Sequence, residues 1–423
     1  MTHATTRPFL LAVPIAAEHS GSAHATVQVI PGPTPIPDAE ATAARDITDE
    51  TALSLPRLTR RSALLGAAAL FAPLAPQLSF ARARPPAPPP GTILLNGNEN
   101  PYGPSPAARQ AILASVDEAP RYAYSSIDTL AAKIAMREGI PVAQVVIGSG
   151  SGELLRMAAL LASTTMPGSE LVASKPTYEE LPEFAGRMGL KVLWTAPDSA
   201  HRHDLNAMRA TITDRTSLVY VCNPNNPTGT AVTRDALEAF VRSVPPRTTV
   251  IVDEAYIDFV EGFGMGTVAG LVQKVPNLIV LRTFSKIHGL AGLRIGYAIS
   301  SEAIAKRFAD LSLVWPNTTG VDAALASYGD FEFLKSTREA IVADRTRVHA
   351  ALDRIGRPHT EAQGNFVFFD TGIPVQQFRD RMLAKGIKVG RPFEGYDTWS
   401  RVTIGRREEV DQFLAALLEA LKA

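Results

Sequence analysis

Lys286 is the side chain in this sequence best suited to covalent chemistry. It stands in a polar stretch between the apolar runs 278–281 and 297–299, directly after Ser285 and eight residues before Arg294. Both runs have the length and composition of buried strands, so the lysine is expected in a loop at the rim of a sheet. A lysine amine in such a loop can form a Schiff base with a carbonyl compound. Because most lysines are solvated surface charges, the assignment of Lys286 to this chemistry needs support from other residues.

Polar clusters also follow two apolar runs upstream. Residues 222–229 contain a dense Asn/Pro motif that ends in Thr-Gly, and they follow the run 218–221. Residues 253–256, Asp-Glu-Ala-Tyr, follow the run 249–252. Ligands of open α/β sheets bind outside the carboxyl ends of the strands, which is where all these polar groups are predicted to lie. The alternative for Asp253 is a helix N-cap, and for the Asn/Pro motif a simple turn.

A glycine- and serine-rich loop at 148–152 follows the apolar run 145–147 and opens a helix. The free backbone amides at a helix N-terminus form a natural phosphate site. Such a loop is by default a flexible turn, but its place after a strand favours an anion site.

These motifs, in this order, resemble the fold-type I pyridoxal-phosphate aminotransferases, and most closely the histidinol-phosphate aminotransferase family. The resemblance runs from about Ile93 to the C-terminus. It implies an α/β fold with a large domain, in which helices flank a mostly parallel seven-stranded sheet, and a smaller C-terminal α/β domain. The alternation of predicted strands and helices independently favours a parallel sheet with right-handed crossovers.

The resemblance implies pyridoxal 5′-phosphate as the cofactor. Lys286 would hold it as an internal aldimine and then carry the proton of the substrate's α-carbon. Asp253 would keep the ring nitrogen protonated, so that the ring acts as an electron sink. Asn226 and Tyr256 would hydrogen-bond the phenolic oxygen, and Tyr178 would stack on the ring. The groups implied for the phosphate are Ser285, Arg294 and the amides of Ser151 and Gly152.

The family pattern also implies substrate contacts. Arg401 matches an arginine that would bind the α-carboxylate of the amino donor, and Arg391 stands one place later than a second family arginine. Both can alternatively be exposed charges of a small domain. Further polar groups of the expected pocket are Tyr102, Asn98 and Asn365. Tyr122 aligns with a tyrosine that reaches the phosphate of the partner subunit, so we expect a homodimer.

The composition restricts the other partners. The 423 residues include 42 basic and 42 acidic side chains, so nothing favours nucleic acid or an acidic membrane surface. Cys222 is the single cysteine, which excludes an intramolecular disulfide, and we expect it to be a small buried side chain. No apolar run reaches 18 residues. His201 and His203 resemble a metal pair, but without further ligands nearby a solvated loop is favoured, and we predict no metal site.

The N-terminal ninety residues differ from the rest. We divide the chain into a disordered extension (1–55), a signal segment (56–83), a Pro-rich linker (84–92), an N-terminal arm (93–105), a large cofactor-binding domain (106–300), and a linking helix with a small C-terminal domain (301–423). Arg60-Arg61, a short apolar stretch and a small-residue triplet resemble a twin-arginine signal. This predicts export to the periplasm; the alternative is a cytoplasmic protein with an unstructured or anchoring leader.

The predicted reaction is the transfer of an amino group between an L-amino acid, or a histidinol phosphate-like amine, and a 2-oxo acid in two half-reactions. An exported enzyme would not meet the cytoplasmic intermediates of histidine biosynthesis, so aromatic or other amino acids are equally plausible donors. The alternatives are a lyase or decarboxylase of the same fold, which would use the same cofactor residues, and a non-catalytic cofactor-binding protein.

Overall fold

The computed structural model describes residues 89–262, 264–312 and 314–422. The predicted extension at 1–55, the signal segment at 56–83 and part of the Pro-rich linker lie outside the described residues. Among the helices that are described, none is both long and apolar enough to cross a lipid bilayer.

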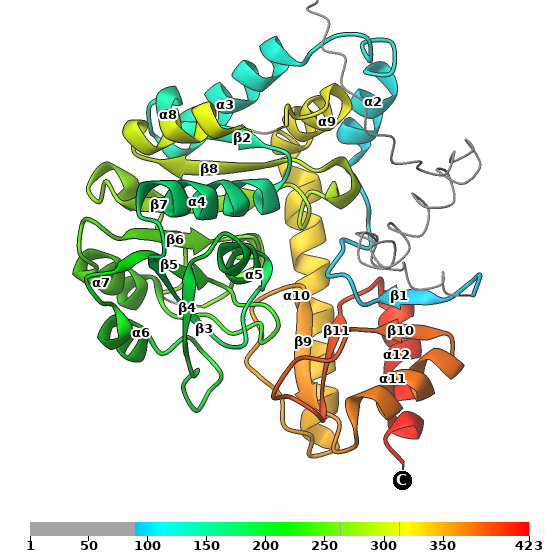
Figure 1. The fold of residues 1–423 in the computed structure, drawn as a ribbon. Coiled ribbons are helices and arrows are strands. Elements are labelled where there is room, and N and C mark those ends of the chain that lie inside the picture. The colour runs from blue at the N-terminus through cyan, green and yellow to red at the C-terminus, as the bar shows by residue number, and fades with distance from the viewer. Residues whose placement is uncertain (1–88, 263, 313, 423) are drawn as a thin grey trace, which may run out of the picture. The chain divides into compact units, whose positions relative to one another are not determined.

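A seven-stranded sheet forms the centre of the large domain (Figure 1). Its strands are β2 (Val145–Gly148), β3 (Glu170–Ser174), β4 (Lys191–Thr195), β5 (Thr216–Cys222), β6 (Thr249–Asp253), β7 (Leu278–Thr283) and β8 (Gly296–Ser300). They lie in the order β2-β8-β7-β6-β5-β3-β4. Strand β8 is antiparallel to both of its neighbours, and the other paired strands are parallel. The predicted mostly parallel sheet is therefore confirmed.

Apolar packing on both faces of this sheet explains the uninterrupted apolar runs. Along β6, Val250 and Val252 belong to one hydrophobic cluster and Ile251 to another, as expected for side chains that alternate across a sheet. The helices of this domain are α2 (Pro106–Ala114), α3 (Tyr124–Glu138), α4 (Ser151–Thr165), α5 (Glu180–Arg187), α6 (Leu205–Thr211), α7 (Arg234–Ser243), α8 (Glu302–Leu311) and α9 (Thr318–Tyr328). Short 3-10 turns lie at Val142–Gln144, Ile257–Phe259, Ala269–Gln273 and Ala291–Leu293.

Helices α8 and α9 lie between β8 and the small domain in the sequence. Val321 of α9 packs in the same hydrophobic cluster as Leu130 of α3, and Phe308 of α8 packs in the other cluster of the sheet. The sequence boundary at 300/301 grouped these two helices with the C-terminal part. Their packing places them instead with the large domain.

The small domain consists of α10 (Phe331–Arg354), β9 (Phe366–Asp370), α11 (Val375–Ala384), β10 (Ile387–Val389), β11 (Trp399–Thr403) and α12 (Arg407–Ala420). Strands β9 and β11 pair antiparallel. The N-terminal arm joins this domain, because β1 (Ile93–Leu95) pairs parallel with β10 and Leu95 is buried in the same hydrophobic cluster. The N-terminal arm thereby passes between the small domain and the carboxyl ends of the strands of the large sheet.

Candidate active site

A cavity of about 350 Å³ lies at the carboxyl ends of β5, β6 and β7 and at the N-terminus of α4. The walls contain most of the predicted site residues: Asn98, Ser151, Gly152, Tyr178, Asn226, Asp253, Tyr256, Ser285, Lys286, Arg294, Arg391 and Arg401. Segments about 300 residues apart in the sequence, such as those of Asn98 and Arg401, therefore meet in one place. Cys222, buried as expected, also contributes to the wall.

Asp253 is the buried acid of this cavity and is only 2% exposed. Its Oδ2 accepts a hydrogen bond from the Tyr220 hydroxyl (3.1 Å), and its Oδ1 accepts one from the backbone amide of Ala255 (3.1 Å). Burial raises the pKa of Asp253 to about 6, while these two hydrogen bonds favour the ionised form and limit the increase. The sequence did not indicate Tyr220, because an aromatic residue inside an apolar strand usually belongs to the core.

Lys286 lies in the loop after β7 and is half-buried. Its Nζ donates a hydrogen bond to the carbonyl oxygen of Asn98 (3.1 Å). Burial, together with the positive charge of Arg401, lowers the pKa of Lys286 to about 8. At pH 7 an amine with a pKa of 8 is about 10% neutral, roughly 300 times more than one with a pKa of 10.5. The site therefore prepares the lysine for attack on a carbonyl group.

The N-terminal amides of α4, Ser285 and Arg294 form an anion cradle in the wall of the same cavity. Helix α4 begins at Ser151, and its first amides have no intrahelical acceptor. The Nη1 of Arg294 donates to the carbonyl oxygen of Ala291 (3.0 Å) and lies 3.4 Å from Ser285 Oγ. Gly150, with φ +85°, leaves space for this guanidinium: a Cβ there would lie 2.4 Å from Arg294 Nη2.

Arg401 projects from β11 of the small domain into the same cavity and is 8% exposed. Its Nη1 donates to Asn226 Oδ1 (2.5 Å) and its Nη2 to the carbonyl oxygen of Asn96 (2.7 Å), whereas its Nε has no partner among the described residues. No carboxylate of the described residues lies within 4.0 Å of it. Burial lowers the pKa of Arg401 to about 10, but the guanidinium remains charged near neutral pH. The site therefore contains a buried cation without a carboxylate partner among the described residues. Because Oδ1 of Asn226 accepts from Arg401, its NH₂ group is left as a hydrogen-bond donor.

Asn98 connects the N-terminal arm to the site. It has a left-handed backbone (φ 52°), its Nδ2 donates to the Tyr256 hydroxyl (3.1 Å), and its backbone amide donates to Thr403 Oγ1 (2.9 Å). The Asn98 carbonyl oxygen accepts from both Lys286 and Asn365 (3.1 Å each). Through these hydrogen bonds the N-terminal arm fixes the positions of Lys286 and Tyr256 relative to the small domain.

Three predicted site residues do not line the cavity in this chain. Asn365 is buried behind the arm and braces it through its bond to Asn98. Tyr102 packs on the small-domain core, with the Arg406 guanidinium 5.5 Å from its ring centroid. Tyr122 is 73% exposed and lies 5.6 Å, centroid to centroid, from Tyr124.

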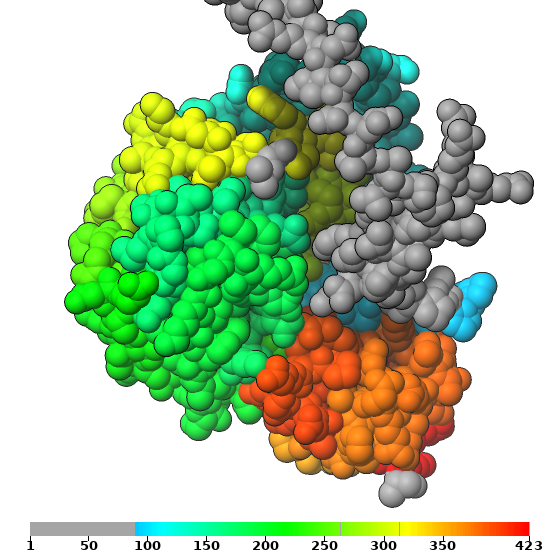
Figure 2. All heavy atoms as spheres, in the orientation of Figure 1, coloured from blue at the N-terminus to red at the C-terminus, as the bar shows by residue number. Residues whose placement is uncertain are grey.

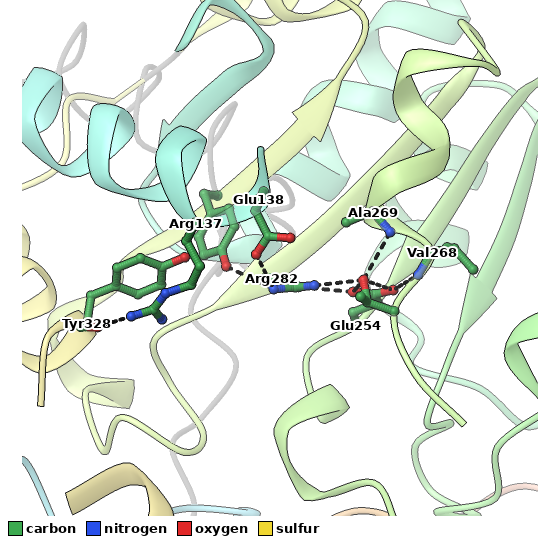
Figure 3. A network of polar contacts seen from close by, with 9 residues as sticks. Arg137, Glu138, Glu254, Val268, Ala269, Arg282 and Tyr328 are labelled. Atoms are coloured by element: carbon green, nitrogen blue, oxygen red, sulfur yellow. Dashed lines mark hydrogen bonds and ion pairs between the residues drawn. The ribbon is translucent and has the colours of Figure 1, made fainter. Parts of the chain in front are cut away.

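A buried ion network supports the strand ends beside the cavity (Figure 3). Arg282 of β7 contacts Glu254, which directly follows Asp253, at 2.9 Å and Glu138 of α3 at 2.8 Å. Glu254 also accepts a hydrogen bond from the backbone amide of Val268 (2.8 Å). Arg282 thereby offsets part of the negative charge that Glu254 places beside Asp253.

These features match what pyridoxal phosphate requires. The cavity has the volume of a small-molecule site, with an amine at Lys286 for the aldehyde, a buried acid at Asp253 for the ring nitrogen, and the cradle of Ser151, Ser285 and Arg294 for the phosphate. Tyr178 is 38% exposed and remains available to cover the ring face; burial raises its pKa to about 12, so it stays neutral.

The model of the family described as "Aminotransferase class I and II" matches residues 90–417. The chain belongs to the class I and II aminotransferases. Pyridoxal phosphate is the cofactor of this family, and the fold, enzyme class and cofactor predicted from the sequence are confirmed.

Two relatives have been assigned different substrates. The aminotransferase is 39% identical over 338 residues to the histidinol-phosphate aminotransferase of Moorella thermoacetica (78% of this chain, 85% of that protein). It is 38% identical over 330 residues to the aromatic amino acid aminotransferase of Rhodococcus opacus (77% and 89%). The crystal structure of histidinol-phosphate aminotransferase from Sinorhizobium meliloti in complex with pyridoxal-5′-phosphate shares 27% identity with a TM-score of 0.74, covering 82% of this chain and 99% of that one.

Proposed function

We propose that this aminotransferase uses Lys286 as its catalytic lysine and Arg401 as the anchor for the α-carboxylate of an L-amino acid or 2-oxo acid. The observation that carries this assignment is the pairing of two groups in one cavity. A lysine with a lowered pKa faces a buried arginine that has no carboxylate partner among the described residues. A carboxylate ligand would satisfy the free hydrogen-bonding capacity of Arg401 and balance its charge.

The side chains of the cavity have separate roles in the proposed reaction. Bound pyridoxal phosphate supplies an electron-poor ring that takes up the electron pair left when the substrate's α-carbon loses its proton. Lys286 Nζ removes that proton, and its lowered pKa keeps a useful fraction of the amine neutral near pH 7. Asp253 would hold the proton on the ring nitrogen. Asn226 and Tyr256 would hold the phenolic oxygen, and Arg401 would orient the α-carbon through the carboxylate.

The test uses the full chain loaded with pyridoxal phosphate and a panel of amino donors and 2-oxo acids. We expect oxo-acid production by the wild type. Lys286→Ala should lose both this activity and the visible absorption band of the lysine-bound cofactor. Arg401→Gln should keep the band but raise KM for amino acids by about 100-fold, which corresponds to a charge-assisted bond worth about 3 kcal/mol. Release of carbon dioxide or ammonia without stoichiometric oxo-acid exchange would instead identify a lyase.

We also propose that the enzyme is a homodimer. Its support is an exposed aromatic surface around Tyr122, where Tyr124 packs edge-on against Trp315 at 5.0 Å between centroids. These side chains are 73%, 52% and 61% exposed, and a second copy would cover them. A fully active monomer in sedimentation velocity would contradict this proposal.

The twin-arginine layout at 56–83 supports a third proposal, export of the folded enzyme to the periplasm. Such a route suits a protein that must load its cofactor before it leaves the cytoplasm. A variant with Arg60→Lys and Arg61→Lys is expected to remain in the cytoplasmic fraction of the host cell. If it fractionates like the parent chain, the export proposal is wrong.

A further inference from the structure

Besides Arg294 of the phosphate cradle, two arginines line the cavity, and they differ in how their charge is balanced. Arg401 is buried and has no carboxylate partner, whereas Arg391 forms an ion pair with Glu179, with Nη2 and Oε2 2.5 Å apart. Glu179 directly follows Tyr178, the aromatic residue of the cavity wall, and stands at the N-cap of α5. The positive charge of Arg391 is therefore already matched by the protein itself.

The ion pair belongs to a contact between the two domains. The guanidinium of Arg391 lies 4.5 Å from the ring centroid of Phe393, and one residue further on Glu394 pairs with Lys175 (2.8 Å). Two opposite pairs therefore join the segment after β3 to the loop after β10, with no net charge. In Figure 2 the green surface of the large domain meets the orange-red surface of the C-terminal domain.

In the proposed function, the substrate's side chain would meet the part of the cavity wall that is assigned neither to the cofactor nor to the α-carboxylate. With the α-carboxylate on Arg401, the α-amino group near Lys286 and Tyr178 over the cofactor ring, this part of the wall includes Glu99 and Arg391. The side chain would therefore meet an exposed carboxylate and a cation that Glu179 has neutralised. A second carboxylate or a phosphate would have to displace Glu179 from Arg391 and approach Glu99 as well.

We propose that Glu179 sets the substrate class of this aminotransferase: it holds Arg391 so that monocarboxylic amino acids with uncharged side chains are preferred over dicarboxylic or phosphorylated donors. The inference rests on the proposed function, in which Arg401 binds the α-carboxylate. Specificity of this kind comes from a repulsive element placed against the wrong substrate as well as from attraction to the right one.

The expected size of the effect follows from the exposure of the pair. The side chains of Glu179 and Arg391 are 37% and 54% exposed, and such pairs contribute only a few-fold to an equilibrium. Removing Glu179 also removes its direct repulsion of an incoming anion. We therefore expect the ratio of kcat/KM for L-glutamate to that for L-phenylalanine to rise about tenfold in Glu179→Gln, and this gain to shrink at high salt.

The experiment compares the cofactor-loaded wild type, Glu179→Gln, Glu179→Asp and the control Glu183→Gln. Glu183 lies on the same helix and pairs with Arg187 (3.1 Å), so its replacement removes an equivalent surface charge. The two donors are L-glutamate and L-phenylalanine. A binding arm uses the unreactive acids glutarate and 3-phenylpropionate, whose dissociation constants are measured by calorimetry.

The proposal is supported if Glu179→Gln shifts both ratios toward the dicarboxylate, Glu179→Asp restores part of the preference, and Glu183→Gln changes neither. It is overturned if Glu179→Gln leaves both ratios within twofold of the wild type, or if Glu183→Gln shifts them equally. Failure of the proposed function is a separate result, because the wild type would then consume no donor. In that case the dissociation constants of glutarate and 3-phenylpropionate still show whether Glu179 disfavours a second carboxylate.

Discussion

The replacement of Asp253 by asparagine separates what this residue does for the reaction from what it does to the fold. Asparagine has nearly the same shape and can still accept from the Ala255 amide and contact the Tyr220 hydroxyl. It differs in carrying no charge, and the carboxylate it replaces is 2% exposed. We expect Asp253→Asn to make the cofactor-free protein more stable at pH 8 and the loaded enzyme much less active.

The magnitude follows from the pKa of Asp253, which burial raises from 3.8 to about 6. Each unit corresponds to 1.36 kcal/mol, so the ionised carboxylate lowers the free energy of unfolding by about 3 kcal/mol. Above pH 6 the group is ionised in both the folded and the unfolded chain, and the full penalty applies. Below pH 3.8 it is protonated in both, and the penalty is absent. The stability gain of the variant must therefore decline as the pH falls from 6 to 4.

The assay is thermal unfolding of the cofactor-free protein at pH 8 and pH 4, with Asp214→Asn as the charge-matched control because its side chain is 99% exposed. We expect the midpoint of Asp253→Asn to rise by several degrees at pH 8 and to match the wild type near pH 4. Added pyridoxal phosphate should stabilise the wild type more than the variant, because only the carboxylate forms an ion pair with the protonated ring nitrogen. An equal gain at both pH values, or none at pH 8, would refute the reasoning.

Three further predictions concern other parts of the site. The rate constant for binding of pyridoxal phosphate to the cofactor-free protein, measured by stopped-flow absorbance, should rise with pH along a titration curve whose midpoint is near 8. The reason is that only the neutral amine of Lys286 adds to an aldehyde. A midpoint above 10 would contradict the lowered pKa. Gly150→Ala should weaken cofactor binding about 100-fold in a fluorescence titration, because the new methyl group would overlap the arginine of the phosphate cradle, whereas Gly186→Ala, which meets nothing within 4 Å, should bind normally. Arg282→Met should lower the free energy of unfolding by about 3–5 kcal/mol, because it leaves the buried carboxylate of Glu254 and the largely buried one of Glu138 without their cation. Arg247→Met, which breaks an exposed pair, should lower it by less than about 1 kcal/mol, and urea denaturation measures both changes.

Much of the fold could be predicted because the strands are buried on both faces and leave apolar runs that local composition identifies. Helix α9 is difficult to identify from the sequence for the opposite reason. Its sequence is dominated by small residues, and Val321, Ala323 and Ala324 are all buried, so it lacks the polar face that marks an amphipathic helix. Its existence depends on packing against α2 and α3.

The sequence by itself determined the chemistry of the site. Asp253 ends a strand, and Lys286 and the Gly/Ser loop each lie at or after the end of one. Parallel strands deliver their carboxyl ends to one edge of the sheet, so the meeting of these residues could be predicted from their order alone. Only the tertiary structure decided what surrounds them. Arg391 and Glu179 are 212 residues apart in the chain, and no local pattern relates them.

The electrostatic state of each group was likewise a property of the folded chain. The lowered pKa of Lys286 arises from burial and from the charge of Arg401, which reaches the cavity from the small domain, and the raised pKa of Asp253 arises from burial. Desolvation and Coulomb interactions depend on distance in space and not on position in the sequence. The residue types therefore defined which reaction is possible. The packing of the two domains around the N-terminal arm determined the pKa, and thus the protonation state, of each reacting group.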